Sequence, residues 1–176
     1  MAISIGSRAP DFRLKGIDGS EYSLASFAGK QACAVIFSCN HCPYVKAWED
    51  RMVQIQADYA DKGVALIAIN SNDATKYPED SFDNMIQRAQ EKNFNFPYVA
   101  DESQEVARAY GAERTPEVFL LDAEGTVRYH GAIDDNYENP DAVQSQYLRD
   151  ALDAVLAGQQ PATAETPSVG CTIKWK

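Results

Sequence analysis

Residues 34–43 read Ala-Val-Ile-Phe-Ser-Cys-Asn-His-Cys-Pro, and this stretch is the strongest indication of the fold in the sequence. The apolar run at its start predicts a buried strand, and the apolar positions after Pro43 recur at helical spacing. Cys39 and Cys42 therefore stand where a strand passes into a helix. The first turn of a helix has unpaired N–H groups and the positive end of the dipole, and both stabilise a thiolate. The stretch predicts a cysteine pair that opens and closes as a disulfide.

The rest of the chain predicts strands that alternate with helices. Apolar runs indicate strands over residues 31–37, 64–69, 97–100, 117–121 and 126–130, and helical spacing indicates helices over 39–59, 82–89, 106–110 and 143–156. Asp18-Gly19, between short alternating pieces, predicts an N-terminal β-hairpin extension. This order predicts an α/β fold with a mixed central β-sheet flanked by helices.

Length and charge narrow the class of function. The chain has 176 residues, enough for one domain with its own core, and its net charge is −10. An acidic chain argues against nucleic acid and anionic membrane surfaces as partners. No apolar run approaches the ~20 residues of a membrane span. The first ten residues lack the pattern of a signal peptide, so we expect a cytoplasmic protein.

The C-terminal segment differs in composition from the rest of the chain. We expect a domain over residues 1–158 and a flexible C-terminal tail over 159–176, because 159–169 is rich in Pro, Ala, Thr and Ser. As a coil, the spacer before Cys171 spans ~20 Å and stretches to ~43 Å. A domain of this size has a radius of gyration of ~16 Å. Cys171 can therefore reach Cys39, which makes it a candidate third redox cysteine.

A docked tail is the alternative to a redox tail. Ile173 and Trp175 would then lie on an apolar patch, and Lys174 and Lys176 on the acidic body.

Three features resemble the thioredoxin superfamily, in the branch of redoxins, membrane-anchored thiol reductases and peroxiredoxins. They are the Cys-Asn-His-Cys pair at a strand–helix junction, Arg-Thr-Pro at residues 114–116 before the final hairpin, and the lead-in Gly-Ser-Arg-Ala-Pro-Asp-Phe at 6–12. The resemblance covers residues 3–157. It implies a thioredoxin-like fold in which Pro116 follows a cis peptide bond and faces the two cysteines.

The resemblance also implies roles for the site residues. Cys39 would be the nucleophile, capping the helix with the greater exposure and the lower pKa, and Cys42 would resolve the mixed disulfide. His41 is similar to a histidine of strongly oxidising periplasmic disulfide donors, which implies a potential above thioredoxin's ~−270 mV. Thr115 and Pro116 would present backbone groups to a substrate that adds as a short strand. The stretch before the cysteines holds no carboxylate, so the proton acceptor for the resolving cysteine is not identified.

The leading interpretation is a thiol-disulfide oxidoreductase that acts on protein or small-molecule disulfides with a reductant system and without a cofactor. A peroxiredoxin-like antioxidant peroxidase is an alternative suggested by the lead-in. Peroxiredoxins place Pro seven residues and Thr or Ser three residues before the reactive cysteine. Here Val35 and Cys39 stand at those distances before Cys42, so the peroxidase motif is absent.

A metal-binding module is the other alternative. Copper-delivery proteins of this fold use two cysteines and a distant histidine, here His130, but separate the cysteines by three residues; His41 or Cys171 could also complete a zinc site. A non-enzymatic interaction protein would not need the intact cysteine pair. Cys33 lies inside an apolar strand and is expected to be a core residue. We assign no metal ligands on this basis.

Overall fold

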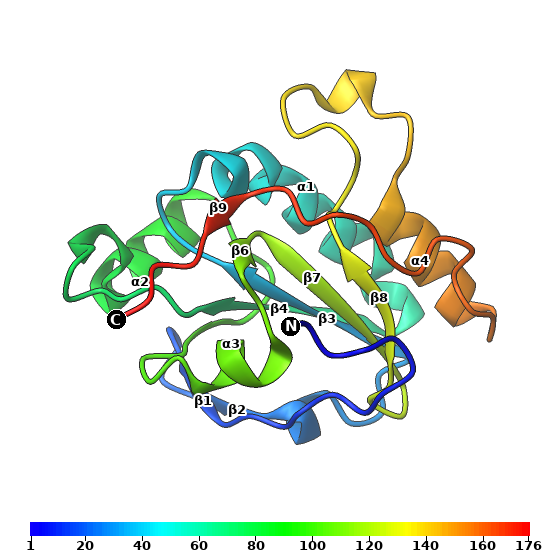
Figure 1. Ribbon diagram of the computed structural model, residues 1–176, viewed down its shortest axis with the longest axis horizontal. Helices are drawn as coiled ribbons and strands as arrows, with labels where there is room; N and C mark the ends of the chain where they lie inside the picture. The colour runs from blue at the N-terminus through cyan, green and yellow to red at the C-terminus, as the bar shows by residue number, and fades with distance from the viewer.

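The computed structural model describes residues 1–176 and is built around a seven-stranded mixed sheet (Figure 1). The strands lie in the order β2-β1-β5-β4-β3-β7-β8. Their bounds are β1 Leu14–Gly16, β2 Glu21–Tyr22, β3 Ala32–Ser38, β4 Val64–Asn70, β5 Tyr98–Ala100, β7 Glu117–Asp122 and β8 Val127–Gly131. The helices are α1 Pro43–Tyr59, α2 Phe82–Glu91, α3 Glu105–Tyr110 and α4 Tyr147–Leu156. None of these helices has the length and apolar character needed to cross a membrane.

The expected α/β fold is confirmed, including the N-terminal hairpin. β1 and β2 pair antiparallel around the Asp18-Gly19 turn, and β1 continues the sheet beside β5. β3 runs parallel to β4 and antiparallel to β7, so the central sheet is mixed. Every residue of β3 and β4 is buried, which explains why both strands read as continuous apolar runs.

Two apolar layers cover the sheet. Trp48 and Met52 of α1 pack on one face together with Met85 of α2 and Leu152 of α4. The opposite face carries α3 and the N-terminal segment, and Figure 1 shows the helices on both sides of the strands. These layers hold the ends of β3 and β4 in place, and the ends carry the polar residues described below.

The last predicted helix begins later than expected. Residues 140–142 form a short 3-10 turn after Asn139, and α4 starts only at Tyr147. Pro140 opens that turn, and Val143, which ends it, has an extended backbone, so the helix expected from residue 143 does not begin there.

The C-terminal tail is packed along the body instead of extending loosely from it. Its strand β9, Cys171–Thr172, pairs antiparallel with β6, Arg114–Thr115. Ile173 is buried in the apolar layer that also contains α3, as the docked-tail alternative predicts, whereas Trp175 is 37% exposed and lies against the Arg108 guanidinium. Figure 1 shows the tail passing beside β6 and the start of α1.

Candidate active site

The two cysteines of the motif lie between the end of β3 and the start of α1. Both are buried, each only 2% exposed, and no disulfide joins them. Cys42, not Cys39, is the N-cap of α1, because its backbone is extended and Pro43 is the first helical residue. A residue before proline is disfavoured in the helical region, so the helix cannot begin earlier. The expectations that Cys39 caps the helix and is the more exposed thiol are wrong.

Cys42 lies among groups that stabilise a thiolate. Hydrogen bonds from the Cys39 thiol, the Cys171 thiol and the Val45 and Cys171 backbone lower the pKa of Cys42 to about 4, against the opposing effect of burial. As a thiol, its Sγ donates to the carbonyl oxygen of Thr115 over 3.5 Å. The helix N-terminus therefore acts on Cys42, the second cysteine of the motif.

Cys39 has surroundings that oppose ionisation. Its hydrogen bond with Cys42, its burial and the nearby carboxylate of Asp80 raise the pKa of the Cys39 thiol well above its usual range. The Thr115 hydroxyl lies 3.6 Å from Cys39 Sγ and favours its thiolate, but it is outweighed. The surroundings of the pair thus favour the thiolate at Cys42, the reverse of the expected order, because a carboxylate lies near the first sulfur and the helix start near the second.

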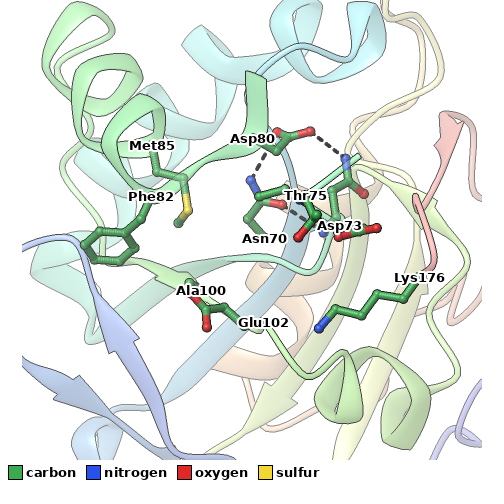
Figure 2. A pocket seen from close by; sticks show the side chains of 11 residues that line it. Asn70, Asp73, Thr75, Asp80, Phe82, Met85, Ala100, Glu102 and Lys176 are labelled. Atoms are coloured by element: carbon green, nitrogen blue, oxygen red, sulfur yellow. Dashed lines mark hydrogen bonds between the residues drawn. The ribbon is translucent and has the colours of Figure 1, made fainter. Parts of the chain in front are cut away.

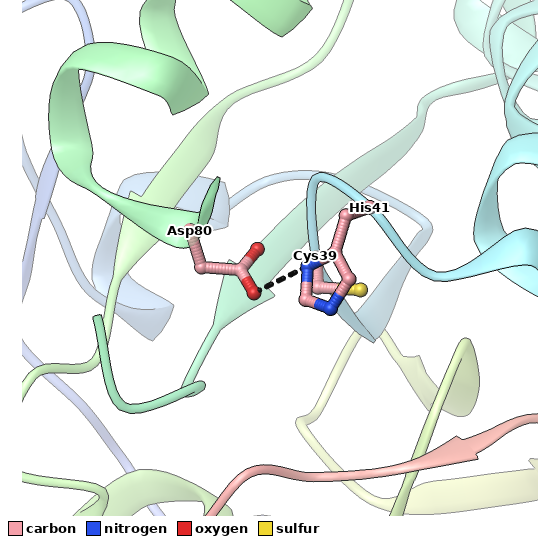
Figure 3. A group of neighbouring side chains, drawn as sticks. All are labelled: Cys39, His41 and Asp80. Carbon is pink, nitrogen blue, oxygen red and sulfur yellow. Dashed lines mark ion pairs between the residues drawn. The ribbon is translucent and has the colours of Figure 1, made fainter. Parts of the chain in front are cut away.

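Asp80 is the functional residue that the sequence analysis missed. Figure 3 shows its carboxylate beside His41 and Cys39, and its side chain is fully buried. His41 Nδ1 lies 2.8 Å from Asp80 Oδ2. Asp80 Oδ1 accepts the backbone N–H of Asn40 over 2.8 Å, and the amide groups of Asn70 and Asn72 also donate to the carboxylate. These donors keep a charged carboxylate in the interior at a defined position.

The arrangement around Asp80 follows from the sheet. Ser38 and Asn70 are register partners in parallel strands, so the loops after them meet at one edge. The Tyr98 hydroxyl connects the two loops, donating to Asn40 Oδ1 over 2.8 Å and accepting from Asn70 over 3.2 Å. Polar residues directly after two neighbouring parallel strands were the available sequence signal for this cluster.

A polar cavity of about 190 Å³ adjoins Asp80 on the side of the residue 70–75 loop (Figure 2). Asn70, Asp73, Glu102 and Lys176 contribute polar side chains to its lining. The cavity brings the C-terminal residue of the chain and the buried carboxylate to the same space.

Thr115 and Pro116 lie where the sequence predicts. Thr115–Pro116 is a cis peptide bond, and Thr115 contacts both cysteines through its hydroxyl and carbonyl groups. Glu117 accepts the backbone N–H groups of Glu113 and Arg114 at 2.9 and 3.0 Å, which holds the chain before the proline.

His130, on the edge strand β8, lies against a buried carboxylate. Its Nε2 lies 2.6 Å from Glu117 Oε2, its side chain is only 12% exposed, and its ring stacks on Phe119. It supports the loop before Pro116 through Glu117. Cys33, by contrast, is buried in the sheet as expected, and burial raises the pKa of its thiol to about 12.

Cys171 joins the motif cysteines through the tail. It packs against the small apolar cluster of Cys39, Cys42 and Val45. Burial, followed by the effects of Cys42, raises the pKa of Cys171 to about 11. Three sulfurs therefore gather at the N-terminus of α1.

One group of side chains has the composition of a metal site. Cys39, His41 and Asp80 offer ligand atoms that lie within 4.8 Å of one another. His130 is not part of this group, so the copper arrangement with a distant histidine is not formed. The carboxylate oxygens of Asp80 already accept three amide N–H groups, which compete with a cation for the same lone pairs.

A reactive dithiol at the strand–helix junction of this mixed sheet defines a thioredoxin-like thiol-disulfide oxidoreductase. The chain belongs to the AhpC/TSA family, whose model matches residues 5–130.

Named relatives and solved structures agree with this class. The thiol-disulfide oxidoreductase ResA of Geobacillus thermodenitrificans is 29% identical over 129 residues, covering 72% of this chain and 68% of that protein. The thioredoxin-like protein YneN of Bacillus subtilis is 28% identical, covering 73% and 71%. A hypothetical protein from Sinorhizobium meliloti is similar over the whole chain, with a TM-score of 0.94, 41% identity and coverage of 100% and 97%. That match includes the tail.

Proposed function

We propose that the protein exchanges its dithiol with disulfides in extended polypeptide segments, and that Cys42 makes the first attack. The observation that carries the proposal is the opposite environment of the two sulfurs: Cys42 caps α1, whereas Cys39 lies beside Asp80. The thiolate is the attacking form in disulfide exchange. The order of roles is thus the reverse of the one implied by the resemblance.

The reaction then runs in two exchanges. The Cys42 thiolate attacks one sulfur of the substrate disulfide, forming a mixed disulfide and releasing the other substrate sulfur as a thiolate. Cys39 loses its proton and attacks Sγ of Cys42, which releases the substrate dithiol and leaves a Cys39–Cys42 disulfide. A reductant system must return two electrons and two protons before the next cycle. In reverse, the oxidised pair accepts electrons from a protein dithiol.

Asp80 and His41 supply a proton path for Cys39 in this scheme. The carboxylate is close enough to Cys39 to affect its charge, and it contacts the imidazole of His41, which is partly exposed. A proton from Cys39 can pass to this pair and on to solvent as Cys39 attacks. Asp80 is therefore our candidate for the proton acceptor of the resolving cysteine. The stretch before the cysteines contains no acidic residue that could take this role.

The low pKa of Cys42 favours the reduced form of the pair. A stabilised thiolate makes the disulfide easier to reduce, so we expect a potential above thioredoxin's ~−270 mV.

The test is equilibration with glutathione at pH 7, followed by acid quenching and mass spectrometry. We expect a two-electron Cys39–Cys42 couple between ~−270 and −120 mV. Reduction of an aromatic disulfide measured with Cys39→Ser and Cys42→Ser identifies the attacking thiol, with Cys33→Ser as the matched control. If the wild-type protein forms no Cys39–Cys42 disulfide, the proposed function is wrong.

Peroxide reduction is a second candidate that the three-sulfur cluster favours, because Cys42 carries a stabilised thiolate with two thiols beside it. Consumption of hydrogen peroxide in the presence of dithiothreitol tests this antioxidant activity. A rate no faster than that of Cys42→Ser would exclude it.

A further inference from the structure

The tail occupies the edge at which a substrate strand would add. β9 pairs with β6 so that Cys171 lies opposite Thr115 and Thr172 opposite Arg114. The N–H of Ile173 donates to the Glu113 carbonyl over 2.9 Å. An extended peptide that recognises this edge would make the same main-chain hydrogen bonds. The tail therefore has the position and direction of a peptide ligand.

Side-chain and backbone contacts on both sides of Cys171 fix the tail in this place. The Arg114 guanidinium donates to the Gly170 carbonyl over 3.0 Å, and Ile173 is buried. The N–H of Lys174 donates to Asn72 over 2.9 Å, and its carbonyl accepts from Gln104 over 2.9 Å. Gly170 itself lies so close to Thr115 that an added Cβ would overlap the Thr115 carbonyl oxygen.

We propose that Cys171 is a built-in exchange partner of the dithiol, carried on a tail strand that competes with substrate for the β6 edge. The inference rests on the proposed function, because it needs the Cys39–Cys42 disulfide as its reactant. In the step itself, the Cys171 thiolate attacks Sγ of Cys42. The Cys42–Cys171 bond forms, the Cys39–Cys42 bond breaks, and Cys39 leaves as a thiolate that takes up the proton lost by Cys171. No external oxidant is consumed.

Oxidation of the motif pair prepares this step. In the reduced protein the Cys42 thiolate opposes ionisation of Cys171. A Cys39–Cys42 disulfide removes that negative charge, so the pKa of Cys171 falls when its target appears. The pairing of β9 with β6 and the packing of Cys171 against the cluster of Cys39, Cys42 and Val45 place Cys171 beside the sulfur that it attacks. Tethering by the tail also gives Cys171 a local concentration of ~mM or more.

The experiment maps disulfides in the full-length protein after oxidation with oxidised glutathione, alkylation of free thiols at low pH, and tryptic mass spectrometry. We expect both Cys39–Cys42 and Cys42–Cys171 links in the wild type, and mainly Cys42–Cys171 in Cys39→Ser. Gly170→Ala, which cannot dock β9, should lower the Cys42–Cys171 yield by ~10-fold or more relative to the exposed control Val169→Ala.

Three negative results have different meanings. A Cys39–Cys42 disulfide without any Cys42–Cys171 link, in both wild type and Cys39→Ser, would overturn the role of Cys171 and leave the proposed function standing. Absence of the Cys39–Cys42 disulfide as well would overturn both. An equal Cys42–Cys171 yield in Gly170→Ala and Val169→Ala would show that docking of β9 does not direct the exchange.

Discussion

The two sides of the dithiol differ more than their short separation in sequence indicates. On the Cys39 side, Asp80 brings a fully buried negative charge, held by amide donors and by His41. On the Cys42 side, the positive end of the α1 dipole and the packed tail lie next to the sulfur, and no carboxylate does. Loops and a tail that are distant in sequence thus give the two sulfurs opposite surroundings, which favour ionisation of Cys42. The spacing of the cysteines alone does not determine these surroundings.

The largest expected effect separates the two cysteines. Cys42→Ser leaves only Cys39 at the motif, with a raised pKa, so the rate of attack on an aromatic disulfide at pH 7 should fall by ~100-fold or more. In Cys39→Ser the serine hydroxyl can still donate to Cys42. The rate at which Cys42 attacks in a single turnover should therefore stay within ~10-fold of wild type. Stopped-flow release of the aromatic thiolate measures both rates. A larger loss of rate in Cys39→Ser than in Cys42→Ser would contradict the proposal that Cys42 is the attacking thiol.

The pH dependence of the reduction potential tests the same asymmetry without mutation. Between the pKa of Cys42, about 4, and the raised pKa of Cys39, reduction takes up one proton for two electrons. The potential should then fall by ~30 mV per pH unit, compared with ~59 mV if both thiols were protonated. Glutathione equilibration from pH 5 to 8 gives the slope.

The same pKa shift affects the stability of the reduced protein. The folded-state pKa of Cys42 lies below its ordinary value of ~8.5, so the thiolate stabilises the reduced fold fully above that value. This contribution declines as the pH falls and is lost below about 4. Urea unfolding of the reduced protein should therefore give a lower free energy of unfolding at pH 5 than at pH 8. The difference between the two pH values should be smaller for Cys42→Ser.

Removing the charge on the Cys39 side should have an intermediate effect. Asp80→Asn eliminates the carboxylate that disfavours a nearby thiolate, so the potential of the pair should rise by ~30 mV. The free energy of unfolding should also fall by ~1–3 kcal/mol, because an amide cannot accept all of the N–H groups that face Asp80. Asp83→Asn, on the exposed face of α2, is the matched control. An unchanged reduction potential in Asp80→Asn would show that the carboxylate does not influence the dithiol.

The smallest expected effect belongs to His41. Its side chain is 29% exposed and its Nδ1 contacts Asp80, so solvent and the carboxylate both reduce its influence on the sulfurs. His41→Pro should lower the potential by less than ~30 mV. His41→Gln distinguishes loss of the imidazole from the added proline. No change in either variant would rule out tuning by His41.

The fold could be predicted because its signals are local. The apolar runs of β3 and β4 and the Asp18-Gly19 turn contain enough information to specify two strands and a hairpin. The resemblance added the cis bond before Pro116, which the structure confirms. The predicted start of α4 was wrong because apolar spacing shows which face of a helix is buried but does not show where the helix begins.

The candidate site was less predictable because it depends on contacts between distant segments. Asp80 lies 40 residues from Asn40 in sequence, yet it accepts that residue's N–H. The helix start depends on Pro43, which keeps Cys42 out of the helical region, whereas apolar spacing indicated a helix from residue 39. The tail pairs with β6 although its composition is typical of a loose segment. The nucleophile and the role of Cys171 stay predictions.

The most direct test of the central claim is a pH titration of the reduced protein labelled with ¹³C at each cysteine Cβ, with resonances assigned from single Cys→Ser variants. The Cβ shift reports ionisation at each sulfur without requiring access by a reagent. The account predicts that Cys42 titrates near pH 4 while Cys39 remains protonated above its ordinary range. Titration of Cys39 at low pH, with Cys42 protonated at pH 7, would contradict it.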